Sequence, residues 1–284
     1  MKFNHPKTIR SLIAAGCASL LLVPCLARAD EIAEKGRAIF KQHQQGVVTV
    51  QIVVKSKVSM EGMGDQATET KQEVTGTVLD GSGLTVLALS ATDPGAMIQG
   101  MLEGQDSKIK METEISDIKV LLEDSTEVAA DIVLRDKDLD LAFIRPKAKP
   151  AQPMKAIDMT QAGKAEILDQ VVTLNRLGTA TGRSYSAAVE RISSIVQRPR
   201  LLYIPDSTMT TTTLGAPAFT LDGKPLGLFV IRTVKGKGGS GPFSTQANNF
   251  ASVILPVADI MKAASQAPAA VEPGKEAAVD KKDK

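Results

Sequence analysis

The chain has 284 residues, with 34 Lys and Arg against 32 Asp and Glu, and only two Cys. The resulting formal charge of +2 gives no basic excess of the kind that nucleic-acid-binding domains carry, so we expect no nucleic-acid partner. Aromatic residues make up 3% of the chain and Trp is absent, which argues against stacking platforms for bases or sugars.

Residues 1–29 have the pattern of a secretory signal peptide. Three basic residues precede an apolar run over residues 12–26, and Ala27-Arg28-Ala29 offers an A-x-A cleavage site. We expect cleavage after Ala29 and a periplasmic or secreted protein with no membrane span after cleavage. An uncleaved anchor and lipidation at Cys17 are the alternatives.

Export changes the composition of the protein. Both cysteines lie in the signal, so the mature chain has no Cys and a single His, and we expect neither a metal site nor a cofactor. Loss of residues 1–29 removes four basic residues and no acidic one, which leaves a formal charge of −2.

The first half of the mature chain reads as a helix followed by short strands. Apolar residues at helical intervals predict a helix over residues 30–45 with Asp30 as its cap. Residues 55–71 are polar with two glycines and predict a loop. Strands are expected over residues 47–54, 73–79, 84–89, 118–122, 129–134 and 141–145.

Residues 93–117 interrupt this series of strands. Met97-Ile98 and Met101-Leu102 are at helical spacing, which predicts a short helix that caps the first group of strands. The alternative is an adaptable apolar surface for a partner protein.

The second half repeats the pattern after a linker with three prolines at residues 146–153. Strands are expected over residues 170–174, 184–196, 201–204, 216–221 and 226–233, and residues 250–264 predict a last strand and a helix. Residues 265–284 are rich in Ala, Pro, Glu and Lys, so we expect a disordered tail.

Residues 211–219 read T-T-T-L-G-A-P-A-F and residues 221–227 read L-D-G-K-P-L-G. This stretch resembles the nucleophile loop of a trypsin-like serine protease of the HtrA type, which reads G-N-S-G-G-P and continues into a strand. Alignment of Gly215-Ala216-Pro217 with G-G-P puts Leu214 in the position of the nucleophilic serine. Because a leucine side chain has no atom that can attack a carbonyl, serine-type acyl transfer at this position is excluded.

The resemblance extends to the other members of the triad. Residues 74–90 are similar to the family segment that ends in the catalytic histidine, which puts Ser90 in the histidine position. Residues 120–144 resemble the segment that carries the catalytic aspartate, which puts Asp140 there. Asp140 therefore keeps the family's residue but has no imidazole to orient, and we expect its carboxylate to accept hydrogen bonds, including one from Ser90.

Two further residues, His43 and Thr212, also argue against catalysis of this type. His43 is the only histidine of the mature chain, and we expect it to be a solvated helix residue and not a base. Thr212 takes the place of the glycine whose backbone helps to form the family's oxyanion hole, and a β-branched residue resists that conformation.

The resemblance implies an all-β fold: a chymotrypsin/trypsin-like double β-barrel with a short N-terminal helix and a C-terminal helix. The HtrA-like domain would span residues 30–264, with the first barrel at about 46–146, the second at about 154–256 and no PDZ module. The implied function is an exported pseudoprotease of the cell envelope that binds extended peptides or unfolded protein between its barrels. The alternatives are a trypsin-like serine endopeptidase with a non-standard active site and a structural component whose cleft is filled by Leu214.

Overall fold

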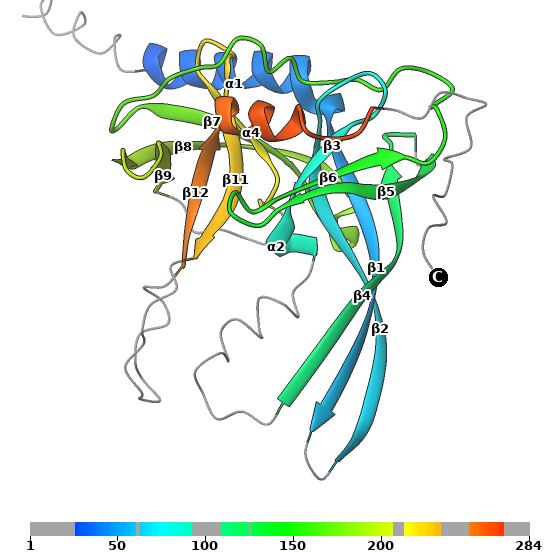
Figure 1. Ribbon diagram of the computed structural model, residues 1–284. Coiled ribbons are helices and arrows are strands. Elements are labelled where there is room, and N and C mark those ends of the chain that lie inside the picture. Colours follow the sequence, from blue (N-terminus) through cyan, green and yellow to red (C-terminus); the bar gives the residue numbers. More distant parts are fainter. Residues whose placement is uncertain are drawn as a thin grey trace, which may run out of the picture.

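The protein is built from two closed antiparallel β-barrels (Figure 1). The computed structural model describes residues 26–60, 63–92, 109–124, 126–206, 213–233 and 250–269. This architecture confirms the expected all-β double-barrel fold. Within the described ranges no helix combines the length and the apolar character needed to cross a bilayer.

The first barrel closes in the order β1-β2-β3-β6-β5-β4. Val48, Val50 and Ile52 alternate with polar residues along β1, so one face of this strand fills the barrel while the other faces outward. The six strands are β1 (Val47–Met60), β2 (Met63–Val78), β3 (Thr85–Ala88), β4 (Ile109–Leu121), β5 (Glu127–Asp136) and β6 (Leu141–Pro146).

The second barrel closes in the order β10-β11-β12-β9-β8-β7. Its interior is packed with fully buried side chains such as Val171, Ile192 and Phe229. The six strands are β7 (Gln170–Arg176), β8 (Tyr185–Val196), β9 (Leu202–Pro205), β10 (Pro217–Thr220), β11 (Pro225–Thr233) and β12 (Phe250–Pro256).

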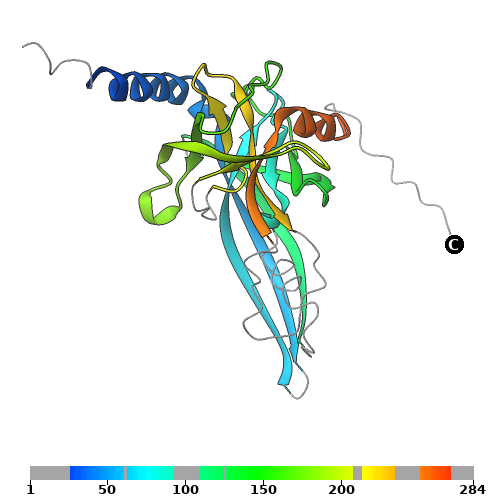
Figure 2. The same ribbon diagram turned by 90° about the vertical axis from the view of Figure 1, so that its left-hand side faces the viewer.

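Helices cover one end of the two barrels (Figures 1 and 2). Helix α1 (Leu26–His43) begins before the expected start at Asp30, so Asp30 lies inside the helix and does not cap it. Ile39 of α1 packs against Val172 and Phe219 of the second barrel. Helix α4 (Val257–Ala264) packs instead on the core that includes the first barrel, while α2 (Leu89–Thr92) is a single turn after β3.

Strands β1, β2 and β4 continue beyond the first barrel as a three-stranded arm (Figure 2). The predicted loop over residues 55–71 is therefore wrong, apart from residues 61–62, which lie outside the described residues. The physical reason is cross-strand pairing: Lys55 of β1 lies opposite Glu69 of β2 and Glu114 of β4, and opposite charges in register stabilise polar strands.

The segment at residues 93–117 is also corrected in part. Its C-terminal portion belongs to β4, which begins at Ile109. The helix expected around Met97 and Leu102 lies outside the described residues.

Between the barrels, Met154 and Ile157 are buried, and their backbone N–H groups bond to the carbonyls of Gly81 and Val78 at 3.0 and 2.9 Å. The connection between the barrels is thereby packed onto the first one.

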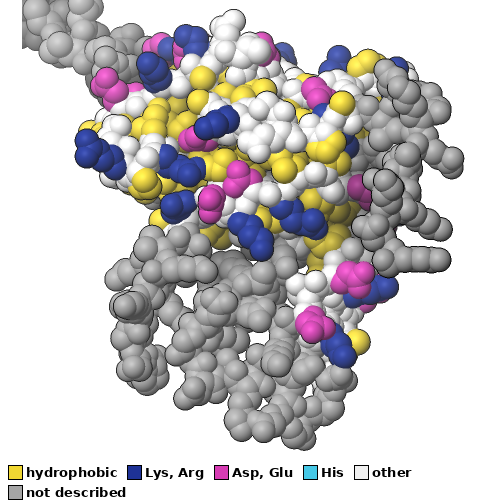
Figure 3. All heavy atoms as spheres, viewed as in Figure 1, with side chains coloured by type: hydrophobic (Ala, Val, Ile, Leu, Met, Phe, Trp, Pro, Cys, Tyr) yellow, Lys and Arg dark blue, Asp and Glu magenta, His cyan; other side chains and the backbone are white. Residues whose placement is uncertain are grey.

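The face shown in Figure 3 has apolar side chains interspersed with both basic and acidic ones. Positive and negative charges alternate on this face, and neither sign forms a continuous field across it.

Candidate functional site

Asp140 lies at the centre of a hydrogen-bonded cluster between the two barrels. Its Oδ1 accepts the backbone N–H of Ser90 at 2.7 Å, and its Oδ2 accepts the Ser90 hydroxyl at 2.8 Å. Oδ2 also accepts the backbone N–H of Ile231, in β11 of the second barrel, at 2.8 Å. Ser90 and Asp140 thus meet in space although they are 50 residues apart in sequence, and the expected bond between them is present.

The backbone at Asp140 is held in an uncommon conformation. Its φ of 57° lies in the left-handed region, which aspartate tolerates better than most residues. The Asp140 carbonyl accepts the N–H of Leu89 at 2.9 Å, so both its backbone and its carboxylate are tied to the segment that carries Ser90. This arrangement fixes the two residues as a structural unit.

Burial dominates the electrostatics of Asp140. Burial raises the pKa of Asp140, while the hydrogen bonds from Ile231 and Ser90 stabilise the carboxylate and partly oppose that rise. A hydroxyl such as that of Ser90 cannot take up a proton near neutral pH, as an imidazole can. The pair can stabilise the junction of the barrels but cannot shuttle a proton.

Leu214 is buried, with 4% of its surface exposed. It belongs to the same apolar cluster as Leu87, Ala88 and Leu228. The Leu214 side chain therefore contributes to the core and offers no nucleophilic atom.

The turn around Leu214 is held tightly against the first barrel. Gly215 has a φ of 82°, its N–H donates to Phe229 O at 2.8 Å, and its carbonyl accepts the Thr77 hydroxyl at 2.9 Å. A Cβ at Gly215 would overlap the carbonyl oxygen of Thr75 and would lie 3.3 Å from the nitrogen of Ala88. Because Ala88 ends β3 just before Ser90, the turn lies beside the Ser90–Asp140 cluster. Thr212, the position expected for the oxyanion hole, lies outside the described residues.

His43 is not the solvated residue that we expected. It is 9% exposed, and its ring stacks on Phe219 with the centroids 4.5 Å apart. Burial lowers the pKa of His43, and its Nε2 has no hydrogen-bond partner within the described residues. The helical periodicity placed His43 on α1 correctly, but the second barrel covers the end of that helix.

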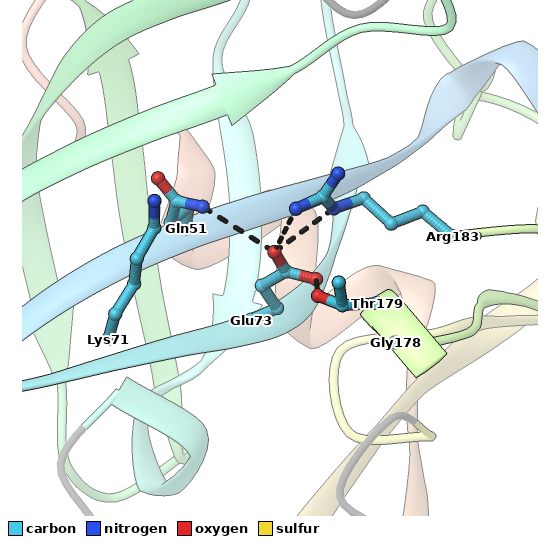
Figure 4. Close-up of a pocket in the computed structure, with 6 residues that line it drawn as sticks. All are labelled: Gln51, Lys71, Glu73, Gly178, Thr179 and Arg183. Carbon is cyan, nitrogen blue, oxygen red and sulfur yellow. Dashed lines mark hydrogen bonds and ion pairs between the residues drawn. The ribbon is translucent and has the colours of Figure 1, made fainter. Parts of the chain in front are cut away.

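A second feature of the junction is a polar pocket of about 370 Å³ (Figure 4). Gln51, Lys71 and Glu73 line it from β1 and β2, and Gly178, Thr179 and Arg183 line it from the turn between β7 and β8. Both barrels therefore contribute to it.

Glu73 organises this pocket. Its Oε1 accepts Arg183 Nη2 at 2.6 Å and Nε at 3.0 Å, with Gln51 Nε2 at 3.4 Å, and its Oε2 accepts the Thr179 hydroxyl at 2.9 Å. The hydrogen bond with Arg183 is the main cause of a lowered pKa of Glu73. Arg183 has a φ of 53°, an unfavourable backbone conformation that aims its side chain across the junction.

Arg176 adds a buried positive charge at the base of the same turn. It is 8% exposed and its guanidinium lies 4.1 Å from the centroid of the Tyr185 ring. Its Nε and Nη1 have no hydrogen-bond partner within the described residues. The Arg176 carbonyl accepts the Thr75 hydroxyl at 3.5 Å, so this end of β7 also contacts β2.

Among the residues that the structure describes, no group of three His, Cys, Asp or Glu side chains is arranged to hold a metal ion.

No protein-family model matches the chain, and no curated protein matches it either. The fold and the local chemistry are accordingly the basis for any statement about function.

Proposed function

We propose that the protein is an exported, HtrA-like pseudoprotease that binds an extended peptide or an unfolded protein segment between its two barrels. The observation that carries this proposal is the chemistry at the three triad positions. Leu214 is buried in the core, and the Ser90 hydroxyl donates a hydrogen bond to the Asp140 carboxylate. A double barrel with these substitutions keeps the junction of the barrels but not the means of acyl transfer.

The edge of β11 supports peptide binding. Phe229 and Ile231 direct their N–H groups away from β12, toward Ala216 O and the Asp140 carboxylate, and Thr233 has the same orientation because strand residues alternate. Strand β10 pairs with β11 only as far as Leu228. The outer edge at Thr233 therefore has no strand partner among the described residues, and an extended peptide could add there through main-chain hydrogen bonds.

The test uses the mature protein and dephosphorylated β-casein, an unfolded protein. We expect binding without cleavage, and no labelling by a serine-directed covalent inhibitor. Thr233→Pro removes the N–H group and should weaken binding, whereas Thr233→Ala keeps that group and should bind as the wild type does. Cleavage of casein by the pure protein would instead support a trypsin-like endopeptidase with a non-standard site.

The burial of Leu214 favours a second candidate, a structural component of the cell envelope whose junction is closed by this side chain. Such a protein would neither cleave nor bind casein. The same binding measurement therefore separates the two candidates.

Export has its own test. N-terminal sequencing of the protein recovered from the cell envelope or the medium should begin at Asp30, whereas an intact residue 1 would favour the uncleaved anchor.

A further inference from the structure

We propose that the pocket between β2 and the β7–β8 turn binds an acidic side chain of the captured peptide, with Lys71 and Arg183 as its cationic contacts. This inference rests on the proposed function and adds a preference for acidic peptides to it. Three observations carry it: where the pocket lies, which of its groups are free, and the charge around it.

The pocket lies two residues along β2 from the contact between β2 and the Leu214 turn. Glu73 lines the pocket, and the carbonyl of Thr75, two residues further on, is in close contact with Gly215, the residue after Leu214. Two residues of a strand span about 7 Å, which is also the spacing of alternate side chains in an extended peptide. A peptide that lies along the junction beside Leu214 can therefore direct one side chain into the pocket.

The resident carboxylate of the pocket is satisfied, and the pocket presents positively charged donors to a ligand. The Glu73 carboxylate already accepts hydrogen bonds from Arg183, Thr179 and Gln51. Lys71 forms no ion pair or hydrogen bond within the described residues, and Figure 4 shows its amine beside Gln51 at the opposite side of the pocket from Arg183. A ligand thus meets an uncommitted ammonium and a guanidinium, while the resident acid is satisfied.

The surrounding charge also favours an anion. The Arg176 guanidinium, whose Nε and Nη1 have no hydrogen-bond partner within the described residues, is buried at the base of the turn that lines the pocket, where screening by water is weak. The Glu127 carboxylate interacts electrostatically with Lys71 and Arg183 and so opposes a bound anion, but it is paired with Lys119 at 2.8 Å. The volume of about 370 Å³ accommodates an Asp or Glu side chain together with adjacent backbone.

The experiment compares dephosphorylated β-casein with the same casein after its carboxylates have been converted to neutral amides. Each is titrated against the wild type, Lys71→Gln, and Lys262→Gln as a control for charge, since Lys262 is exposed on α4 and does not line the pocket. We expect Lys71→Gln to bind untreated casein about two- to fivefold more weakly, the effect of losing one solvent-exposed ion pair. Binding of the amidated casein should be weaker for the wild type and unchanged by Lys71→Gln.

The outcomes separate the two proposals. If the wild type binds untreated casein and Lys71→Gln binds it equally well, the acidic preference is wrong while peptide binding stands. The same conclusion follows if Lys71→Gln weakens binding of the amidated casein as much as binding of the untreated casein. An equal loss for Lys262→Gln would mean that net charge and not this pocket is responsible. If the wild type binds neither casein, the proposed function fails and this inference fails with it.

Discussion

Restoring a serine at the nucleophile position should destabilise the protein. Leu214 is 4% exposed and packs in the cluster that contains Leu87 and Leu228, so Leu214→Ser removes a buried isobutyl group. Replacement of a buried leucine by a small residue costs about 2–5 kcal/mol, and an unpaired buried hydroxyl adds about 1–3 kcal/mol when the site cannot hydrogen-bond it. The tight packing of Gly215 against Thr75 limits how far the turn can collapse into the space. We expect a loss of about 3 kcal/mol or more, equivalent to at least about 6 °C in Tm for a protein of this size.

The assay is urea unfolding followed by far-UV circular dichroism, with Leu168→Ser as the matched control. Leu168 is 66% exposed, so the same substitution there should change stability by no more than about 0.5 kcal/mol. If Leu214→Ser is as stable as Leu168→Ser, Leu214 does not hold the junction closed, and a ligand-contacting role would replace the structural one.

Three other predictions follow from the junction. The double substitution Ser90→His and Leu214→Ser should not restore cleavage of casein, because Thr212 still occupies the oxyanion position and loss of one such donor alone reduces the rate about 10²–10³-fold; only addition of Thr212→Gly should produce measurable hydrolysis. Glu73→Gln should lower the free energy of unfolding by about 1 kcal/mol at neutral pH, as measured by thermal unfolding. Because the pKa of Glu73 is lowered from 4.5, this contribution should be present above pH 4.5 and should vanish as the pH falls through the lowered pKa. A difference in stability that persists in acid would contradict this prediction. Burial lowers the pKa of His43 from 6.5, so its contribution to stability should be complete above pH 6.5 and lost as the pH falls through the lowered pKa. His43→Gln should flatten this part of the curve of stability against pH. An unchanged slope would show that His43 does not control it.

Most strands of the double barrel were predictable because runs of β-branched and other apolar residues lie between turn residues, while their closure into two barrels was implied by the family resemblance. The strands over residues 170–174 and 226–233, for example, correspond to β7 and β11, with small differences at their ends. The arm was missed because its strands are rich in polar residues and show no sustained alternation of apolar and polar side chains. Lys55 resembles a loop residue until Glu69 and Glu114 are placed opposite to it, and that pairing joins residues far apart in the chain.

The pocket illustrates the same limit for the candidate site. Gln51 lies between the buried Val50 and Ile52 of β1, and Glu73 precedes the buried Val74 of β2. The two polar residues are paired across the strands and share one face of them. Nothing in the sequence pairs that face with Arg183, 110 residues after Glu73. Their ion pair depends on how the two barrels dock.

The sequence by itself determined which chemistry two positions cannot perform. Leu214 has no nucleophilic atom and Ser90 has no imidazole, and no conformation can supply the missing atoms. Only the tertiary structure decided what these positions do instead: Leu214 packs in a core, and Ser90 donates to Asp140, which also binds Ile231 from the other barrel. Burial and hydrogen-bond partners arise from contacts between distant segments, so they are properties of the docked barrels and not of any local stretch of sequence.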